Sequence, residues 1–228
     1  GKLMTKDTLV RGGPPTFAQR SEHMGIGLVG KTLGSIGLGN IGAEVFRLCA
    51  PLGMNLIAHD PYIDPAIARS VNVELKDLET VFRESDFLTL NVPLNEETHH
   101  LVNAARLALM KPTAYLINTS RGPVVDQPAL VSALSQDVIA GAGLDVFDPE
   151  PPESNDPLLN LDNVILTPHA LCWTDQCFAG MGAQDLEHVF AIKNGEVPQA
   201  LADPSVANEP VFQKKLEHYQ ERFRTQST

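Results

Sequence analysis

The chain has 228 residues, of which 43% are hydrophobic and 20% are charged, and its formal net charge is −11. This balance is typical of a globular domain with a sizeable core, and the acidic charge argues against the basic face that nucleic acids require. No apolar run reaches the roughly 18 residues that span a bilayer. Three cysteines without CxxC spacing argue against a disulfide framework and a zinc site. We therefore expect a cytoplasmic protein with no metal and with no nucleic-acid or membrane partner.

Short apolar runs alternate with helical patterns from residue 31 onward, after a polar segment broken by Gly12, Gly13, Pro14 and Pro15. The apolar runs predict six strands, at residues 31–36, 55–59, 87–91, 114–118, 139–146 and 164–167. Helices are predicted after residue 42, at 75–83, at 104–110, after residue 126, at 174–193 and at 211–223. This alternation indicates an α/β fold with a doubly wound parallel sheet of the Rossmann type.

Two of these helices have predicted faces or caps. In the helix after residue 42, Val45, Leu48 and Cys49 recur at i, i+3 and i+4, which predicts that they face the core. Asp126 is suited to cap the helix that follows it, in which leucines recur at i and i+4.

A glycine-rich turn follows the first predicted strand and opens the first helix of the alternating region. It is built on Gly37, Gly39 and Gly42 in a GxGxxG pattern. The first glycine permits a tight turn, the second lets a pyrophosphate approach the backbone, and the third allows close packing of helix on strand. The phosphates would then lie at a helix N-terminus, where free N–H groups and the dipole favour anions. The turn therefore predicts dinucleotide binding.

An acidic residue, Asp60, ends the second predicted strand, about 20 residues beyond the turn, where the motif places a ligand of the adenosine ribose. A carboxylate there would repel the 2′-phosphate of NADP, so we expect NAD in preference to NADP. The alternative is that Asp60 only starts the turn it forms with Pro61, although the two roles are compatible.

Three titratable residues follow later strands: Arg121, Glu150 and His169. Ligands of open α/β sheets bind at the carboxyl ends of the strands, so the three are expected to converge. A guanidinium can hold a substrate carboxylate with two hydrogen bonds, an imidazole can exchange the alcohol proton near neutral pH, and a carboxylate beside the imidazole would orient it. The alternatives are a surface loop arginine at Arg121, a solvated loop acid at Glu150 and a hydrogen-bonded histidine at the end of a strand at His169.

Four ordered strings carry a family resemblance: GSIGLGNIG from residue 34, INTSRGPVVD from 117, GLDVFDPEPP from 143 and TPHALCWT from 167. They resemble the NAD-dependent D-isomer-specific 2-hydroxyacid dehydrogenases, and the resemblance extends from about residue 25 to residue 194. It implies an oxidoreductase that transfers a hydride between NAD(H) and a small 2-hydroxy or 2-keto acid.

The resemblance also implies residue roles. His169 would be the acid and base with Glu150 as its partner, and Arg121 would bind the substrate carboxylate and carbonyl. Further cofactor contacts would come from the backbone N–H groups of Asn40 and Ile41, from Asp145 at the nicotinamide carboxamide, and from Val92, Thr119, Ser120, Arg121 and His169 along the cleft.

The family pattern predicts three segments: residues 1–30 as a connecting segment, 31–172 as the NAD-binding domain, and 173–228 as the return helix and the C-terminal part of a split substrate domain. The N-terminal part of that substrate domain has no counterpart here, so we expect NAD binding with little or no turnover by this chain. Members of the family usually dimerise through the cofactor domain, which predicts a homodimer.

Two other readings are compatible with a dinucleotide turn. One is an NAD-binding regulatory protein related to the carboxy-terminal-binding co-repressors, which share the Arg, Glu and His. The other, a short-chain reductase, needs Tyr-x-x-x-Lys, and no tyrosine here has a lysine four residues later. The sequence does not choose the 2-hydroxy acid, and Trp173 is equally compatible with a substrate wall and with a packing role.

Overall fold

The computed structural model describes residues 2–23 and 25–224. The chain divides into two compact units, Gly1–Leu171 and Cys172–Thr228. The first unit contains the sheet, and the described residues of the second unit form two α-helices and one 3₁₀ turn. Among the described residues, no helix has the length and hydropathy needed to span a membrane.

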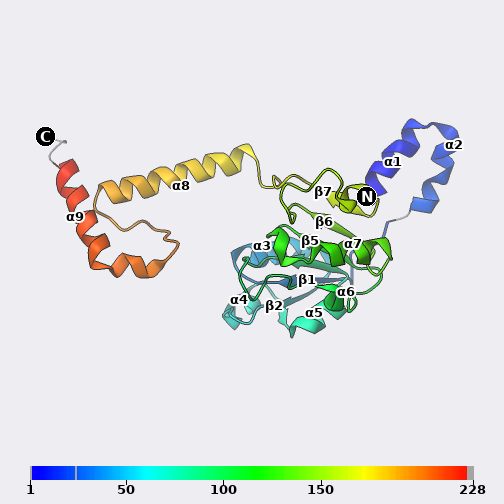
Figure 1. Ribbon diagram of the computed structural model, residues 1–228, viewed down its shortest axis with the longest axis horizontal. Helices are drawn as coiled ribbons and strands as arrows, with labels where there is room; N and C mark the ends of the chain where they lie inside the picture. Colours follow the sequence, from blue (N-terminus) through cyan, green and yellow to red (C-terminus); the bar gives the residue numbers. More distant parts are fainter. Residues whose placement is uncertain (1, 24, 225–228) are drawn as a thin grey trace. The chain divides into compact units, whose positions relative to one another are not determined.

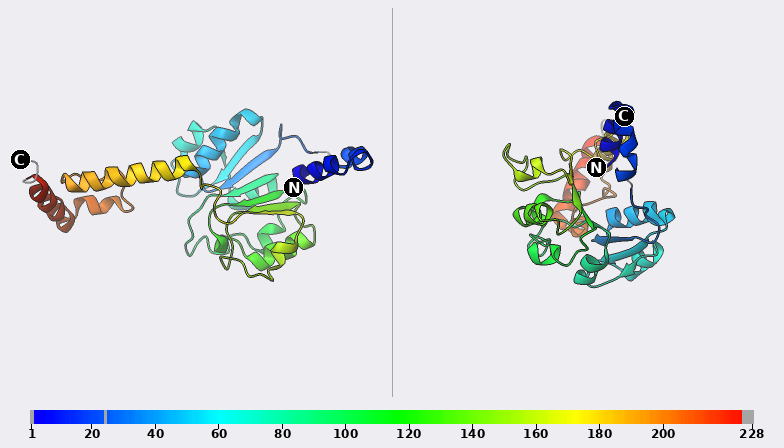
Figure 2. Two further views of the ribbon diagram at one scale, coloured as in Figure 1. Left: turned by 90° about the horizontal axis from the view of Figure 1, so that it is seen from above. Right: turned by 90° about the vertical axis from the view of Figure 1, so that its right-hand side faces the viewer.

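The first unit is built on a single parallel sheet with the strand order β3-β2-β1-β4-β5-β6-β7 (Figures 1 and 2). The strands are β1 (Thr32–Ile36), β2 (Asn55–His59), β3 (Glu74–Leu75), β4 (Phe87–Leu90), β5 (Tyr115–Asn118), β6 (Gly141–Leu144) and β7 (Val164–Leu166). The order reverses beside β1, which is flanked by β2 and β4. The predicted doubly wound parallel sheet is thus confirmed, with one strand more than the six expected.

Helices alternate with these strands and enclose two hydrophobic clusters. The helices of the sheet region are α3 (Asn40–Cys49), α4 (Pro65–Ser70), α5 (Leu78–Glu84), α6 (Ala104–Leu107) and α7 (Gln127–Ser135), with short 3₁₀ turns at Ala50–Leu52, Gly122–Val124 and Pro157–Asn160. The larger cluster packs α5, α6 and α7 against the sheet, with Phe82, Leu116 and Leu130 fully buried. The smaller one packs α3 on β1 and β2 around Phe46.

The buried face of α3 differs from the prediction. Ala43 and Phe46 are buried beside Gly42, whereas Leu48 is 69% exposed, and Val45 and Cys49 only border the cluster. A Cβ on Gly42 would lie 2.5 Å from the carbonyl oxygen of Gly37, so this glycine must face the strand. That close approach fixes the rotation of the helix and turns Leu48 outward.

The segment after β2 also corrects the prediction of one helix over residues 75–83. Leu75 lies in the short strand β3, because the N–H of Lys76 continues the pairing by donating to the carbonyl oxygen of Ala58. The helix α5 begins after Asp77, whose carboxylate accepts the N–H of Thr80 and caps it. The predicted helix at 104–110 likewise ends as a helix at Leu107 and continues as a turn.

The capping prediction for α7 is confirmed. The carboxylate of Asp126 accepts the N–H of Ala129, and Leu130 and Leu134 are buried on the inner face of the helix. The polar segment before the sheet holds α1 (Lys2–Arg11), α2 (Pro14–Phe17) and a 3₁₀ turn at Ala18–His23. Gly13, with φ of +76°, makes the break between α1 and α2 that the glycine and proline run predicts.

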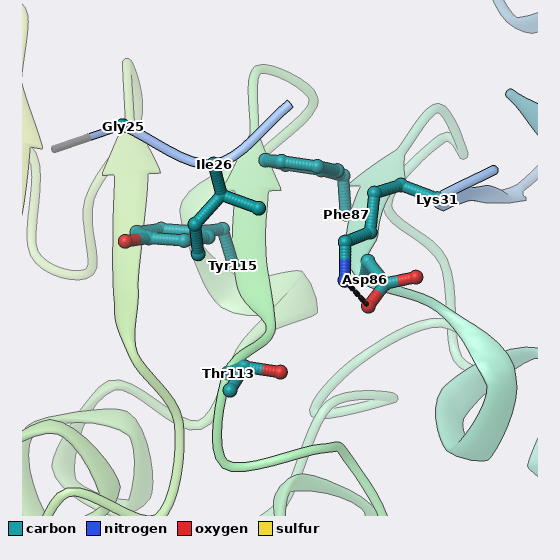
Figure 3. Close-up of a pocket in the computed structure, with 7 residues that line it drawn as sticks. All are labelled: Gly25, Ile26, Lys31, Asp86, Phe87, Thr113 and Tyr115. Atoms are coloured by element: carbon teal, nitrogen blue, oxygen red, sulfur yellow. Dashed lines mark ion pairs between the residues drawn. The ribbon is translucent and has the colours of Figure 1, made fainter. Parts of the chain in front are cut away.

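Asp86 lies at the amino end of β4, on the edge of the sheet where the strands begin (Figure 3). Its side chain is only 12% exposed and is held by Lys111 at 3.1 Å, by Lys31 at 3.6 Å and by the N–H of Thr32 at 2.9 Å. Burial alone would raise the pKa of Asp86, but these partners outweigh burial and hold the pKa below its usual range.

The second unit contains α8 (Asp175–Lys193) and α9 (Pro210–Arg224), close to the predicted helices, with a 3₁₀ turn at Pro204–Asn208. The hydroxyl of Thr174 caps α8 by accepting the N–H of Cys177. The two helices pack against each other, with Leu216 of α9 buried and the ammonium of Lys193 5.4 Å from the ring of Phe223. Trp173 is 65% exposed and contacts Phe178 edge to face.

Candidate functional site

The carboxyl ends of the strands form one edge, because the register is in step across the sheet. Ile36 pairs with His59 on one side and with Leu90 on the other, and Leu90, Asn118 and Leu144 continue the row. The loops that carry the predicted site residues all leave the sheet at this edge. It includes the point between β1 and β4 where open α/β sheets bind ligands.

The glycine turn has the geometry that its motif predicts. Gly37 has φ of +90°, and its N–H donates to the carbonyl oxygen of His59 at 2.9 Å. A Cβ at this position would lie 2.2 Å from the carbonyl oxygen of Asn91. Only glycine adopts this positive φ readily and has no Cβ to collide with Asn91. The turn can therefore pass tightly between β2 and the end of β4.

The N-terminus of α3 is open to a ligand. Gly39 is its N-cap residue, offers no side chain to cap it, and has open space where a Cβ would stand. Asn40 and Ile41 begin the helix, so their N–H groups have no acceptor within it. This arrangement fits the pyrophosphate of a dinucleotide, which needs both close backbone approach and free donors.

Asp60 lies beside this turn at the end of β2. Its Oδ2 accepts the N–H of Leu38 at 2.9 Å, and its Oδ1 accepts the N–H of Tyr62 at 3.0 Å. Asp60, Gly37 and Gly39 line a cavity of about 340 Å³. The carboxylate therefore takes part in the turn with Pro61 and also lines the cavity beside the glycines. The turn role and the predicted ribose role are compatible.

A second cavity of about 460 Å³ continues along the edge. It shares Asn91, Val92 and Pro93 with the first cavity. Its lining includes five of the predicted cofactor contacts: Ile41, Val92, Thr119, Ser120 and Arg121. Most of the predicted cofactor residues thus line these two adjoining cavities, and four line neither: Asn40, Gly42, Asp145 and His169. Asp145 and His169 lie farther along the edge, after β6 and β7.

The loop that carries Arg121 is fixed by Asn118, the buried last residue of β5. The side-chain oxygen of Asn118 accepts both the N–H and the hydroxyl of Ser120, and its amide donates to the carbonyl oxygen of Arg121 at 2.9 Å. Next to it, a Cβ on Gly122 would lie 1.7 Å from the carbonyl oxygen of Phe147. The Arg121 loop therefore rests directly on the backbone of the loop that carries Glu150.

Glu150 and His169 come together as a hydrogen-bonded pair. Nδ1 of His169 lies 2.6 Å from Oε1 of Glu150, and the N–H of Phe147 donates to Oε2 at 3.2 Å. The hydrogen bond with His169 is the main cause that lowers the pKa of Glu150, and the charge of Arg121 also contributes. His169 has φ of +52°, a conformation that non-glycine residues rarely adopt and that occurs often at functional sites.

Asp145 supports the loop that carries His169. Its Oδ1 accepts the hydroxyl of Thr167 at 2.6 Å and the N–H of Ala170 at 3.1 Å, and its Oδ2 accepts the N–H of Leu171 at 3.4 Å. Burial would raise the pKa of Asp145, but these hydrogen bonds outweigh burial and lower it. The carboxylate is therefore an ionised anchor at the end of β6.

The described residues hold no group of three or more His, Cys, Asp or Glu side chains that could bind a metal ion. The edge provides instead a guanidinium, a carboxylate–imidazole pair and an open helix N-terminus. This set can bind an anionic dinucleotide and an anionic substrate, and it can exchange a proton.

Comparison with protein families agrees with this arrangement. Residues 2–170 match the model of the D-isomer specific 2-hydroxyacid dehydrogenase NAD-binding domain. The chain belongs to this family. The resemblance inferred from the four sequence strings is thereby confirmed.

Several members of the family are similar over most of the chain. The glyoxylate reductase of Korarchaeum cryptofilum is 42% identical over 206 residues, which are 90% of this chain and 62% of that protein. The D-3-phosphoglycerate dehydrogenase of Methanocaldococcus jannaschii is 41% identical over 198 residues, 86% of this chain and 38% of that protein. The chain therefore spans less than two thirds of the length of these relatives.

The fold is shared with solved structures of the family. The D-lactate dehydrogenase of Lactobacillus jensenii with NAD+ has a TM-score of 0.77 at 29% identity, covering 89% of this chain and 64% of that one. The apo D-mandelate dehydrogenase of Rhodotorula graminis has a TM-score of 0.79 at 32% identity, covering 89% of this chain and 61% of that one.

Sequence reasoning missed three residues of this edge: Asn118, Tyr62 and Glu97. A polar residue ending a buried strand was the available signal for Asn118. Tyr62 and Glu97 meet across 35 positions of sequence, and no local pattern connects them.

Proposed function

We propose that this chain is the nucleotide-binding part of an oxidoreductase that transfers a hydride between NAD(H) and carbon 2 of a small D-2-hydroxy or 2-keto acid. The observation that carries the proposal is the 2.6 Å pair of Glu150 and His169 on the same sheet edge as the glycine turn and Arg121. The relatives named for glyoxylate, lactate and phosphoglycerate act on acids of this class, which supports the proposal.

The cofactor part of the proposal assigns the open N-terminus of α3 to the pyrophosphate and Asp60 to the adenosine ribose. Val92, Thr119 and Ser120 would line the path toward the nicotinamide, and Asp145 would hold its carboxamide. When bound, NAD(H) supplies or accepts the hydride. The protein supplies the binding, the orientation and the proton.

The proton part assigns His169 as acid and base. With Nδ1–H donated to Glu150, the other ring nitrogen, Nε2, is the one that exchanges a proton with the substrate oxygen. The proton goes to the carbonyl oxygen during reduction and returns from the hydroxyl during oxidation. Arg121 would hold the substrate carboxylate with two parallel hydrogen bonds and polarise the neighbouring carbonyl.

The preference for NAD over NADP follows from Asp60. Its carboxylate is fixed by two backbone N–H groups, so it cannot turn away from a ligand without breaking both hydrogen bonds. Ribose hydroxyls can donate to its remaining lone pairs, whereas a 2′-phosphate would be repelled. We therefore propose that the cofactor is NAD.

The test is a pair of titrations, with NADH and NADPH, on the wild type, Asp60→Asn and the control Asp64→Asn. Asp64 caps α4 and does not line the cavity, so its substitution makes the same charge change outside the site. We expect the wild type to prefer NADH, Asp60→Asn to reduce that preference about tenfold, and the control to keep it. Equal wild-type affinity for the two cofactors would contradict the NAD assignment.

Turnover and assembly are tested separately. Oxidation of NADH with glyoxylate, pyruvate or hydroxypyruvate, yielding the D-acid where the product is chiral, supports the oxidoreductase, and L-acid products would contradict it. The homodimer stays a prediction from the family resemblance. Sedimentation that shows only monomer at micromolar concentration would contradict it.

A further inference from the structure

Tyr62 and Glu97 join two loops that line the Asp60 cavity. The hydroxyl of Tyr62, three residues beyond the end of β2, donates to Oε2 of Glu97 at 2.6 Å. Glu97 lies in the loop that follows β4. Both residues line the same cavity as Asp60, Gly37 and Gly39. The pair therefore borders the space that the proposed function assigns to the adenosine end of the cofactor.

Both ends of this bridge are fixed by hydrogen bonds of their own. The N–H of Tyr62 donates to Oδ1 of Asp60, so the tyrosine is tied to the ribose carboxylate itself. On the other side, Oδ1 of Asn95 accepts the N–H groups of Glu97 and Thr98, and the hydroxyl of Thr98 donates to the carbonyl oxygen of Pro93 at 2.6 Å. The Glu97 backbone is thus held in an ordered turn.

The proton of the bridge belongs to Tyr62. The hydrogen bond with Glu97 and the charge of Glu97 raise the pKa of the phenol, while a tyrosine is already protonated near neutral pH. The bridge therefore consists of a neutral donor and a carboxylate, and it leaves a full negative charge on Glu97.

The cavity is consequently bordered by two carboxylates. No lysine or arginine is among the described residues that line it. His59 also lines it, and its Nδ1 lies 3.0 Å from the carbonyl oxygen of Lys76, so that side of the ring is already engaged with the backbone. Sites that accept a 2′-phosphate provide an arginine or similar cation for it. This cavity has instead the two carboxylates of Asp60 and Glu97.

We propose that Glu97, held in place by the Tyr62 hydroxyl, is a second determinant of cofactor specificity that excludes the 2′-phosphorylated nucleotide. The inference rests on the proposed NAD binding and extends it. Asp60 selects by accepting hydrogen bonds from ribose hydroxyls. Glu97 selects through repulsion alone, as a charge added against the wrong ligand.

The test compares the ratio of the dissociation constants for NADPH and NADH in the wild type, Glu97→Gln and the matched control Glu96→Gln. Glu96 is the neighbouring exposed carboxylate and does not line the cavity. A carboxylate about 8 Å from a phosphate dianion in water contributes repulsion equivalent to about fivefold in affinity. We expect Glu97→Gln to lower the ratio by about that factor through tighter NADPH binding, with NADH unchanged, and Glu96→Gln to leave the ratio as it is.

Tyr62→Phe tests the holding role. It keeps the ring and the Glu97 charge but removes the hydrogen bond, so the ratio should fall by less than in Glu97→Gln. In the double variant Tyr62→Phe/Glu97→Gln the ratio should equal that of Glu97→Gln alone, because Tyr62 acts through Glu97.

Three results distinguish a failure of the Glu97 specificity role from a failure of the proposed NAD binding. An unchanged ratio in Glu97→Gln, or an equal change in Glu96→Gln, would overturn the specificity role while leaving NAD binding intact. A parallel loss of NADH and NADPH affinity in Glu97→Gln would show a structural role only. A wild-type chain that binds neither nucleotide would instead overturn the proposed function.

Discussion

The two edges of the sheet treat their carboxylates differently. At the amino edge, Asp86 is shielded from solvent and surrounded by Lys31, Lys111 and a backbone N–H. At the carboxyl edge, Asp60 and Glu97 face a cavity without a lysine or arginine among its described lining residues. Removing one member of a partly buried ion pair destabilises the fold because the remaining charge loses its partner, whereas a charge that faces a cavity is available to a ligand. The comparison predicts that substitutions at the two edges affect different quantities.

The largest expected effect is at the carboxyl edge and affects rate alone. Replacing His169 by Ala removes the proposed acid and base, so whatever rate of 2-keto acid turnover the wild-type chain shows should fall by roughly 100- to 10,000-fold. Because the His169 side chain is 44% exposed, the midpoint of thermal unfolding and the affinity for NADH should change little. Steady-state kinetics together with thermal unfolding test this prediction. A midpoint of thermal unfolding lowered as much as in Asp86→Asn, the amino-edge variant described next, would contradict the difference between the two edges.

At the amino edge the expectation is reversed. Asp86→Asn removes the charge that both lysines face. Unfolding in urea near neutral pH should therefore show a free energy of unfolding lower by about 2 kcal/mol. The affinity for NADH should not change. The pKa of Asp86 is lower in the folded than in the unfolded chain. Its contribution is therefore present above the unfolded pKa and is lost as the pH falls through the folded pKa. The wild type and the variant should converge in acid, and a gap that persists there would contradict the charge mechanism.

The two lysines allow a finer test of the same edge. Lys111 lies closer to Asp86 than Lys31 does, 3.1 Å against 3.6 Å, and both are about a third exposed. Solvent screens each ion pair, so Lys111→Met and Lys31→Met should each lower the free energy of unfolding by about 0.5–1 kcal/mol. The loss should be larger in Lys111→Met. Urea unfolding of the single and double variants measures this. A double variant that is no worse than either single one would contradict independent pairing.

The smallest expected effect concerns the charge on Glu150. His169→Asn replaces the main cause of its lowered pKa, so the pKa of Glu150 should move up toward its usual range. Carboxyl-detected NMR titration reports this directly. Arg121→Gln should move the same pKa upward by less, since Arg121 is the last and smallest of the causes. A larger upward shift of the Glu150 pKa in Arg121→Gln than in His169→Asn would contradict the pairing of Glu150 with His169.

The sequence predicted features that depend on neighbouring residues. The glycine turn, Asp60 and the Asp126 cap are local patterns whose physical reasons are contained in a few positions. The parallel sheet follows from alternating apolar runs, and the convergence of Arg121, Glu150 and His169 at one edge follows from that sheet. The assignment of roles to these residues came from the family resemblance.

Features set by distant contacts were missed or wrong. Leu48 fitted the helical period, but the phase of α3 is set by Gly42 against Gly37. β3 has two residues and exists because β2 lies beside it, so it leaves too short a pattern to read. The Tyr62–Glu97 bridge depends on how two loops approach across the sheet edge, which no local periodicity encodes.

The contact between Gly122 and Phe147 has a consequence for how this site can change. A Cβ on Gly122 would lie 1.7 Å from the carbonyl oxygen of Phe147, so the loops carrying Arg121 and Glu150 interlock through their backbones. Neither loop can be exchanged for that of a relative without refitting the other. Chimeras that swap the two loops as one block should keep the geometry, whereas single-loop swaps should lose it. Arg121, the proposed ligand of the substrate carboxylate, and Glu150, the partner of His169, would thus be inherited as one module.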